Sequence, residues 1–439
     1  MKEGTVTDPQ TVEKTRALRI GMFSESFHPV QNGVTTSVRT LTTELRREGH
    51  HVWVFAPEHQ NQPEHETNVV RFPSFVTHLN PEYPLAYPFL PRLQLGSHVE
   101  RLKLDIVHTH TPFVLGLAGA DLAIRRGIPL ISTFHTLYTE YSHYVTFLPE
   151  AFTHTLLEAF LPWYYNRCTT VICPSRTAAD HLKGTGVDTS IEIVPTGIPI
   201  PDPDAVDAAA CAAVREQLDV APRAPLLLYA GRLAPEKQIA WLLDVFAVIR
   251  QSVPDAVLAI AGGGPLLESL SQHAAQIGVG ESTRFMGPVP RCEMDAVYAA
   301  ADLFVFPSPS ETQGLVIGEA RAAGTPSVVI DCGGAPETVQ HGVDGFRIPP
   351  GDMDSFAACV TNLLKDRALL DNLAATARIT AREQTPEQMI LRVLRIYRRA
   401  RESFGSNRAS RMEQMRPTVT ADPAETADPA IEQHDTANT

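Results

Sequence analysis

Short, nearly continuous hydrophobic runs alternate along most of the chain with longer segments in which hydrophobic residues recur at helical spacing. In the first half these runs predict strands at 18–23, 51–56, 105–110, 129–134, 170–175 and 191–197. Segments such as 34–50 and 176–186 lie between them and have the pattern of helices. Hydrophobic strands separated by helices are typical of a parallel sheet with helices on both faces.

The alternation is interrupted at 197–205, GIPIPDPDA, where a high proline content predicts a linker. Beyond it, further hydrophobic runs predict strands at 225–231, 256–263, 283–287, 303–308 and 326–331. The sequence therefore predicts an α/β protein with two doubly wound, Rossmann-like domains, residues 17–200 and 201–384, facing a central cleft. Ligands bind at the carboxyl ends of strands in such sheets, so we expect the site in this cleft.

The end of the chain has two different patterns. Residues 385–404 form an amphipathic, basic segment that predicts a helix packing back on the N-terminal domain. Residues 405–439 are polar and without periodicity, and we expect this tail to be disordered.

Composition limits the classes of function that this protein can have. The 439 residues carry a formal net charge of −13, which argues against nucleic-acid binding, so an anionic ligand needs a local positive field. The six cysteines have no CxxC spacing and predict reduced thiols. No apolar run is long enough to span a bilayer. We expect a cytoplasmic protein that at most rests on a membrane surface.

Two cations follow the first predicted strand of the second domain. In YAGRLAPEK the strand ends at Gly231, and a helix is expected to begin near Pro235. Arg232 and Lys237 would then flank a helix N-terminus, where free backbone amides favour an anion. A surface ion pair with Glu236 is the alternative, but the position at a strand end favours a phosphate site.

A second glycine-rich loop, AGGGP at 261–265, also follows a predicted strand. Glycines let the backbone approach either a ligand or a neighbouring element closely. The spacing differs from the dinucleotide-binding fingerprint, so both interpretations stay open.

The segment SETQGLVIGEA at 310–320 carries two acids, Glu311 and Glu319, around a predicted strand-to-helix junction. The helix should end at Gly324. Glu311 could accept sugar hydroxyls, and Glu319 could grip a ribose diol. Alternatively, Glu311 caps the helix and Glu319 is a buried acid paired with Arg321. The backbone amides expected to hold phosphate at the helix start belong to Gln313, Gly314, Leu315 and Val316.

These motifs together resemble family 4 of the retaining, GT-B-fold glycosyltransferases. The resemblance rests on GRLAPEK, on the E-x7-E arrangement of SETQGLVIGEA and on GTPSVV in the second domain. In the first domain it rests on ESFHPVQNGVTTSV, which matches the family's glycine loop, and on STFHT, its histidine-bearing strand end. It covers about residues 17 to 404.

The resemblance implies roles for individual residues. The Gly33 amide would face the donor diphosphate, while Arg232 and Lys237 would neutralise charge on the leaving nucleoside diphosphate. Glu311 would bind hydroxyls of the transferred sugar, and His135 would lie near that sugar in a catalytic or positioning role.

For the donor, the resemblance implies that Glu319 binds the ribose and that Val289 lies against the base. Family members of this kind retain the anomeric configuration without a fixed nucleophile. Because the cations of the predicted site are arginine and lysine, we expect no metal or other cofactor. The DxD strings at 202–204 and 352–354 lie in the linker and at a predicted helix start, where a metal–diphosphate site is not expected.

The acceptor is the least determined feature. The chain looks most similar to members that glucosylate diacylglycerol at a membrane, which implies UDP-glucose as donor and an α-linked glycolipid as product. Aromatic stretches at 74–95 and 141–168 are either an interfacial surface or domain core. Alternatives are another nucleotide sugar, a phosphatidylinositol-type or soluble acceptor, a sugar-nucleotide epimerase, or a non-catalytic nucleotide-sugar binding module. The oligomeric state is left open.

Overall fold

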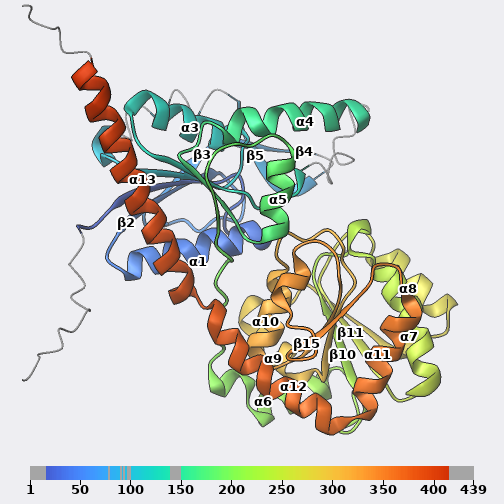
Figure 1. Ribbon diagram of the computed structural model, residues 1–439. Coiled ribbons are helices and arrows are strands. Elements are labelled where there is room, and N and C mark those ends of the chain that lie inside the picture. Colours follow the sequence, from blue (N-terminus) through green and yellow to red (C-terminus); the bar gives the residue numbers. More distant parts are fainter. Residues whose placement is uncertain are drawn as a thin grey trace, which may run out of the picture.

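The computed structural model describes residues 16–414, except for 78–79, 89–90, 92–93, 96–99 and 139–149. Within these residues the chain forms two α/β domains, each built on one parallel sheet with helices on both faces (Figure 1). The fold class predicted from the hydrophobic pattern is confirmed.

The N-terminal domain has a sheet of seven parallel strands. In sheet order these are β3 (Val69–Phe72), β2 (His51–Pro57), β1 (Arg19–Phe23), β6 (Ile106–Thr109), β7 (Leu130–Thr133), β8 (Thr170–Cys173) and β9 (Ile191–Ile193). The chain winds outward in opposite directions from β1 and β6, so the switch point of this sheet lies between these two strands.

Helices cover both faces of this sheet (Figure 1). One face packs against α3 (Val114–Arg126), α4 (Glu150–Tyr165) and α5 (Arg176–Gly184). The other packs against α1 (Gly33–Arg47) and α13 (Pro386–Gln414).

The C-terminal domain has a six-stranded parallel sheet. Its strands are, in sheet order, β12 (Thr283–Gly287), β11 (Val257–Ala261), β10 (Leu226–Ala230), β13 (Leu303–Phe306), β14 (Ser327–Ile330) and β15 (Gly345–Ile348). Here the switch point lies between β10 and β13. One face is covered by α6 (Ala208–Gln217), α9 (Arg291–Ala300), α10 (Leu315–Ala323) and α12 (Arg367–Thr380), and the other by α7 (Ile239–Ser252), α8 (Leu267–Gln276) and α11 (Met353–Lys365).

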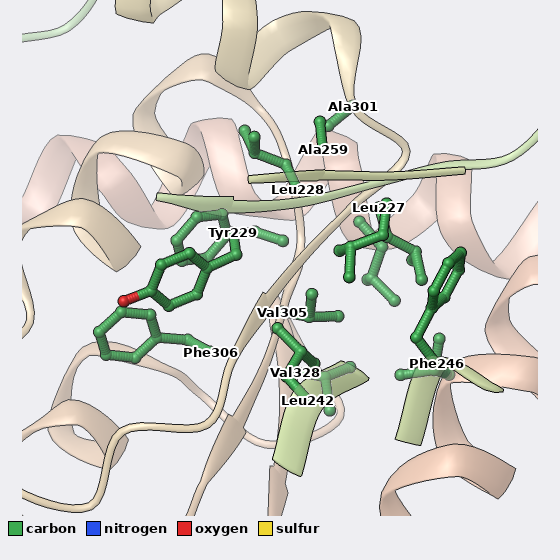
Figure 2. Packing of buried hydrophobic residues seen from close by; sticks show 14 of the residues in the cluster. Leu227, Leu228, Tyr229, Leu242, Phe246, Ala259, Ala301, Val305, Phe306 and Val328 are labelled. Atoms are coloured by element: carbon green, nitrogen blue, oxygen red, sulfur yellow. The ribbon is translucent and has the colours of Figure 1, made fainter. Parts of the chain in front are cut away.

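Strand β10 shows why the hydrophobic runs are uninterrupted. Leu227 and Tyr229 point to one face of the sheet and Leu228 to the other, and all three are buried (Figure 2). The Tyr229 ring stacks on Phe306 of β13, with ring centroids 5.8 Å apart. A strand buried on both faces has no polar side, so its sequence reads as one apolar run.

The hydrophobic pattern did not predict four of the strands. β3 and β15 are edge strands, while β4 (Ser74–Thr77) and β5 (Asn80–Ala86) form a separate antiparallel hairpin. Edge strands are buried less and include polar residues such as Arg71 and Arg347. The pattern in these short segments was therefore too weak to indicate strands.

Helix α13 crosses from the C-terminal domain onto the N-terminal domain (Figure 1). Its buried face, including Met389, Val393 and Tyr397, joins the core formed by α1 and the first sheet. The helix continues to Gln414, so the expectation of a disordered tail from 405 is wrong for its first ten residues. The segment 405–414 contains Arg, Ala, Met, Glu and Gln, which favour helix, and no proline. Residues 415–439 lie outside the described residues.

Candidate active site

The residues predicted to carry chemistry in the C-terminal domain follow the two strands at its switch point. Arg232 and Lys237 come after β10, and Glu311 comes after β13. The Lys237 Nζ lies 2.5 Å from Glu311 Oε1, and the two side chains are only 13% and 18% exposed. The buried Ser308 hydroxyl also donates to Glu311 Oε1, at 3.2 Å. The structure thus places a shielded ion pair where a ligand is expected in this class of sheet.

The polypeptide around the two cations differs in one respect from the sequence prediction. No α-helix begins at Pro235: residues Pro235–Lys237 form a 3-10 turn, and α7 begins at Ile239 after Gln238 adopts a left-handed conformation. Proline accounts for the discrepancy, because it is favoured in the first turn of either kind of helix. Lys237 therefore extends from a tight turn, while half-buried Arg232 lies at the strand end.

The glycine loop 262–264 packs against this same strand end. A Cβ on Gly262 would lie 1.9 Å from the Gly231 carbonyl oxygen, and one on Gly264 would lie 2.4 Å from that of Leu233. The Leu233 amide donates to Gly263, at 2.9 Å. Of the two interpretations left open above, the structure favours close packing of two backbones, which fixes the position of the Arg232 loop.

The loop that carries Glu311 leads into the N-terminus of α10. Gly314 has a φ of +75° and brings the chain from the loop into the helix, which ends at Gly324 as predicted. Gly333 and Gly334 lie behind the loop: the Gly334 amide donates to the Glu311 carbonyl, and a Cβ on Gly334 would lie 2.1 Å from the Thr312 oxygen. The amides of the first turn of α10 begin beside Glu311, where a helix N-terminus favours an anion.

Glu319 lies one turn into α10 and has partners other than the one expected. Its Oε2 accepts from the Tyr298 hydroxyl at 2.8 Å, and its Oε1 lies 3.4 Å from Arg291 Nη2. The expectation of pairing with Arg321 is wrong, because that side chain points to the Thr338 carbonyl and Asp344. Burial raises the pKa of Glu319, while Arg291 acts in the opposite direction.

Val289 lies two residues before Arg291, at the start of α9, and packs against the domain core. Arg291, the first residue of α9, therefore joins Glu319 to the helix that follows Val289.

The N-terminal domain contributes a histidine from each of two adjacent strands. His135 follows β7, and its Nε2 lies 3.0 Å from Nδ1 of His110, which follows β6. Burial lowers the pKa of His135 to about 4 and that of His110 well below the usual value. Both rings are therefore neutral near pH 7 and can act as hydrogen-bonding groups without charge.

Gly33 is the first residue of α1, which Asn32 caps by accepting from the Thr35 amide at 2.8 Å. A Cβ on Gly33 would lie 3.7 Å from Leu315 Cδ1 of α10. The N-termini of the two helices thus approach each other across the domain boundary, one from each domain.

Two more contacts join the domains at the same place. The Thr312 hydroxyl donates to the His135 carbonyl at 2.9 Å, so the Glu311 loop lies against the histidine strand end. The side-chain amide of Gln313 accepts from the Thr196 amide and donates to the Thr196 carbonyl, at 3.0 and 3.1 Å. Because the Gln313 side chain holds the linker, only its backbone is left for the predicted role beside Gly314, Leu315 and Val316.

The sequence interpretation missed several residues around the site. They are Ser308, Gly333, Gly334, His110 and Glu25. His110 was detectable, because the run DIVHTH places histidines at a strand end facing the expected cleft. Glu25 was detectable only as an acid after β1. Its Oε1 accepts from the Leu115 amide at the start of α3, at 2.5 Å, and burial raises its pKa to about 7.

Within the described ranges, no group of three or more His, Cys, Asp or Glu side chains is arranged to hold a metal ion. The helices of that part of the chain are all too short or too polar to traverse a bilayer.

Comparison with solved structures defines the class of fold. Sucrose-phosphate synthase from Thermosynechococcus elongatus superposes with a TM-score of 0.71 at 22% identity, over 87% of this chain and 98% of that one. Anabaena HepE in complex with UDP superposes with a TM-score of 0.69 at 20% identity, over 86% and 99% of the two chains. The two facing Rossmann-like domains are those of a GT-B glycosyltransferase.

Sequence comparison identifies the family. Residues 31–200 match the model described as Glycosyltransferase Family 4, and residues 212–380 match Glycosyl transferases group 1. Alpha-monoglucosyldiacylglycerol synthase of Streptococcus pneumoniae is 33% identical over 71% of this chain and 70% of its own length. The enzyme of that name from Acholeplasma laidlawii is 30% identical over 71% and 80%. The chain belongs to glycosyltransferase family 4 and is a hexosyltransferase.

A mannosyltransferase is also similar over much of its length. The GDP-mannose-dependent alpha-(1-6)-phosphatidylinositol monomannoside mannosyltransferase of Mycolicibacterium smegmatis is 30% identical over 79% of this chain and 89% of its own.

Proposed function

We propose that this protein transfers glucose from UDP-glucose to a membrane lipid, 1,2-diacylglycerol, and forms an α-linked glycolipid. The observation that supports this best is the Lys237–Glu311 pair beside the N-terminus of α10, with His135 held against the same loop by Thr312. In such a transfer the diphosphate is bound by a cation, and the hydroxyls of the sugar are bound by a carboxylate. The acceptor hydroxyl approaches from the facing domain.

In this proposal, positive charge on the protein stabilises the departing nucleoside diphosphate. Arg232, Lys237 and the first-turn amides of α10 face the diphosphate, with the Gly33 amide opposite. Fixed donors of this kind act where charge develops in the transition state and need no reorganisation. The proposal assigns this role to Arg232 and Lys237, without a metal ion.

The chemistry proposed at the anomeric carbon is retention on one face. Glu311 is engaged by Lys237 and Ser308, which suits a carboxylate that accepts sugar hydroxyls better than one that attacks the anomeric carbon. The acceptor hydroxyl would enter on the face from which the diphosphate leaves, and a donor phosphate oxygen would take its proton. Glu319 would bind the ribose, and Val289 would lie against the base.

Two observations support a lipid acceptor: the names of similar enzymes, and the exposed apolar side chains of the N-terminal domain. Both synthases that are similar over most of this chain are named for diacylglycerol products. In the N-terminal domain, Val76 of β4 and Tyr87, which follows β5, are 59% and 44% exposed. Leu156 and Trp163 of α4 are 53% and 48% exposed. Exposed apolar and aromatic side chains of this kind are suited to a membrane interface. We propose peripheral attachment at the inner face of the cell membrane. Residues 141–149 of the second aromatic stretch lie outside the described residues.

A second candidate uses GDP-mannose and a phosphatidylinositol-type lipid, since the similar Mycolicibacterium enzyme is named for that reaction. A pooled assay separates the two. Vesicles containing diacylglycerol, phosphatidylinositol and a monoglycosylated lipid are incubated with UDP- and GDP-sugars, and products are analysed by mass and by the anomeric proton coupling. An α-glucosyl diacylglycerol supports the proposal, and a mannosyl inositol lipid supports the second candidate. Donor epimerisation without acceptor, or donor binding without any product, contradicts both.

A further inference from the structure

Three histidines, of which His108 and His110 are buried and His135 is half-buried, form a continuous row at the carboxyl ends of β6 and β7. The His108 and His110 rings stack with centroids 4.3 Å apart, and the His110 and His135 centroids are 5.3 Å apart at an interplanar angle of 23°. The His110 Nδ1 to His135 Nε2 distance is 3.0 Å. Nearly coplanar rings joined edge to edge are in the geometry of an N–H···N hydrogen bond.

The other side of His110 determines the direction of that bond. Its Nε2 lies 3.3 Å from Met22 Sδ on β1, and a thioether sulfur can only accept. A neutral His110 therefore carries its proton on Nε2 and presents an unprotonated Nδ1 to His135. The His135 Nε2 must then be the donor, which leaves the lone pair of a neutral His135 on Nδ1.

A second histidine, which lies in β6 itself, holds the His110 ring in place. The His110 ring stacks on His108, whose Nδ1 lies 2.7 Å from the Tyr397 hydroxyl of α13 and whose Nε2 lies 2.7 Å from Thr133 Oγ1. All three rings are buried or half-buried, so water does not compete readily for these bonds.

We propose that His110 is a positioning residue that holds His135 in the tautomer whose Nδ1 accepts a hydrogen bond from a hydroxyl of the transferred sugar. The inference rests on the proposed function for the identity of the sugar, and on the His110–Met22 contact for the tautomer. The competing explanation is that His110 only fills the core, in which case its shape matters and its Nδ1 lone pair does not.

Two substitutions separate these explanations. In His110→Asn, the side-chain oxygen can occupy the place of Nδ1 and still accept from His135. In His110→Leu, the volume is largely kept and the acceptor is lost. We expect kcat to fall about tenfold to a hundredfold in His110→Leu, with a smaller change in KM for the donor, because misplacing a reacting group by a fraction of an ångström has effects of this size. We expect His110→Asn to recover most of kcat.

A half-buried histidine at the opposite end of the sheet provides the matched control. His50 Nδ1 accepts from the Leu18 amide at 3.1 Å, before β1 begins. His50→Leu should lower the melting temperature as His110→Leu does, but leave kcat unchanged.

Nitrogen-15 NMR of histidine-labelled wild-type protein reads the tautomer directly, with the His135 signals assigned by their loss in His135→Gln. The proposal expects protonated Nε2 and unprotonated Nδ1 on His135 in the wild type and in His110→Asn, and a mixed or inverted tautomer in His110→Leu. Protonated Nδ1 in the wild type overturns it, and this readout holds whether or not the chain transfers glucose.

Deoxy analogues of UDP-glucose give the kinetic counterpart. One analogue should be poor for the wild type and no poorer than UDP-glucose for His110→Leu, because His135 is then no longer held in the tautomer whose Nδ1 accepts from the sugar. Equal ratios in both proteins for every analogue, or a His110→Leu enzyme with wild-type kcat, would overturn the positioning role. Failure of the wild type with UDP-glucose itself would instead contradict the proposed function.

Discussion

At the residue scale, the polar groups of the site differ in how their charge is balanced. Lys237 and Glu311 neutralise each other at 2.5 Å in partly shielded positions, and Glu319 has Arg291 and Tyr298. Glu25 is different: it accepts from the Leu115 amide, and its Oε2 has no hydrogen-bond partner among the described residues. A carboxylate in that environment is poorly solvated, so its protonated form is favoured.

The first prediction concerns the pH dependence of stability at Glu25. Its pKa is raised from 4.5 to about 7 in the folded protein. The unfolded chain therefore releases this proton at lower pH than the folded one, and the wild type loses stability as pH rises from 4.5 to about 7. Glu25→Gln lacks this loss. Its unfolding free energy relative to wild type should rise by up to about 3 kcal/mol over that range.

Thermal melting of both proteins at several pH values measures the effect. The melting temperature of Glu25→Gln should gain on that of the wild type from about pH 5 to about pH 8. A difference that does not change with pH, or one that changes in the opposite direction, would show that Glu25 is ionised in the folded protein. Asp352→Asn is the control, because Asp352 caps α11 and its hydrogen bonds to Ser355 lower its pKa instead of raising it.

Much of the site's chemistry was visible in the sequence because most of the predicted site residues, such as Arg232, Glu311 and His135, come shortly after a hydrophobic run. The sequence did not show which side chains these residues contact. Glu319 pairs with Arg291 from the preceding helix rather than with Arg321, since α10 turns Arg321 towards Asp344. Which residue meets which across two helices depends on packing angle, and periodicity within one segment carries no information on it.

At the element scale, strand ends and helix starts position the site. The Glu311 loop is shaped by Gly314, which enters α10 with a φ of +75°, and by Gly333 and Gly334, which allow another backbone to lie behind it. The strands with continuous apolar runs were all predicted, whereas two of the four edge strands, β3 and β15, and the hairpin were missed because they are only partly buried.

The second prediction tests the packing behind this loop. A Cβ added at Gly334 would lie 2.1 Å from the backbone oxygen of Thr312, so the loop carrying Glu311 must move. We expect Gly334→Ala to lower kcat/KM for the donor at least about tenfold and to lower the melting temperature. Steady-state kinetics and a thermal melt measure both.

Gly184 is the matched control for this change. It ends α5, and an added Cβ there would have no neighbour within 4 Å. Gly184→Ala should therefore be neutral or slightly stabilising. Wild-type kinetics in Gly334→Ala would mean that the position of the loop does not limit the reaction.

At the scale of the whole molecule, the chain crosses between the domains twice, once at the linker and once at the start of α13. Gln313 connects the Glu311 loop to the first crossing, because its buried amide holds both backbone groups of Thr196. Gln384, next to the second crossing, also donates to the Thr196 carbonyl. Hydrogen bonds next to the candidate active site therefore help to fix the relative position of the two domains.

The third prediction concerns Gln313. Gln313→Leu keeps most of the volume but leaves the Thr196 amide buried without a partner, at a cost of about 1–3 kcal/mol to this arrangement. We expect a more open average structure and a raised KM for the donor, with a smaller effect on each domain's own melting. Small-angle scattering should show a larger radius of gyration. An unchanged radius together with an unchanged KM would contradict a role in setting the domain position.

The central claim is that Lys237 and Glu311 form the catalytic centre of a sugar transferase, and turnover of variants tests it most directly. We expect Lys237→Ala and Glu311→Ala each to lower kcat a hundredfold or more while circular dichroism shows that the fold is kept. The melting temperature should fall somewhat, because each variant leaves one shielded charge without its partner. The control is Lys183→Ala, which removes a lysine from an exposed pair with Asp180 at 4.0 Å and should keep full activity. Near-normal turnover in both site variants would contradict the claim.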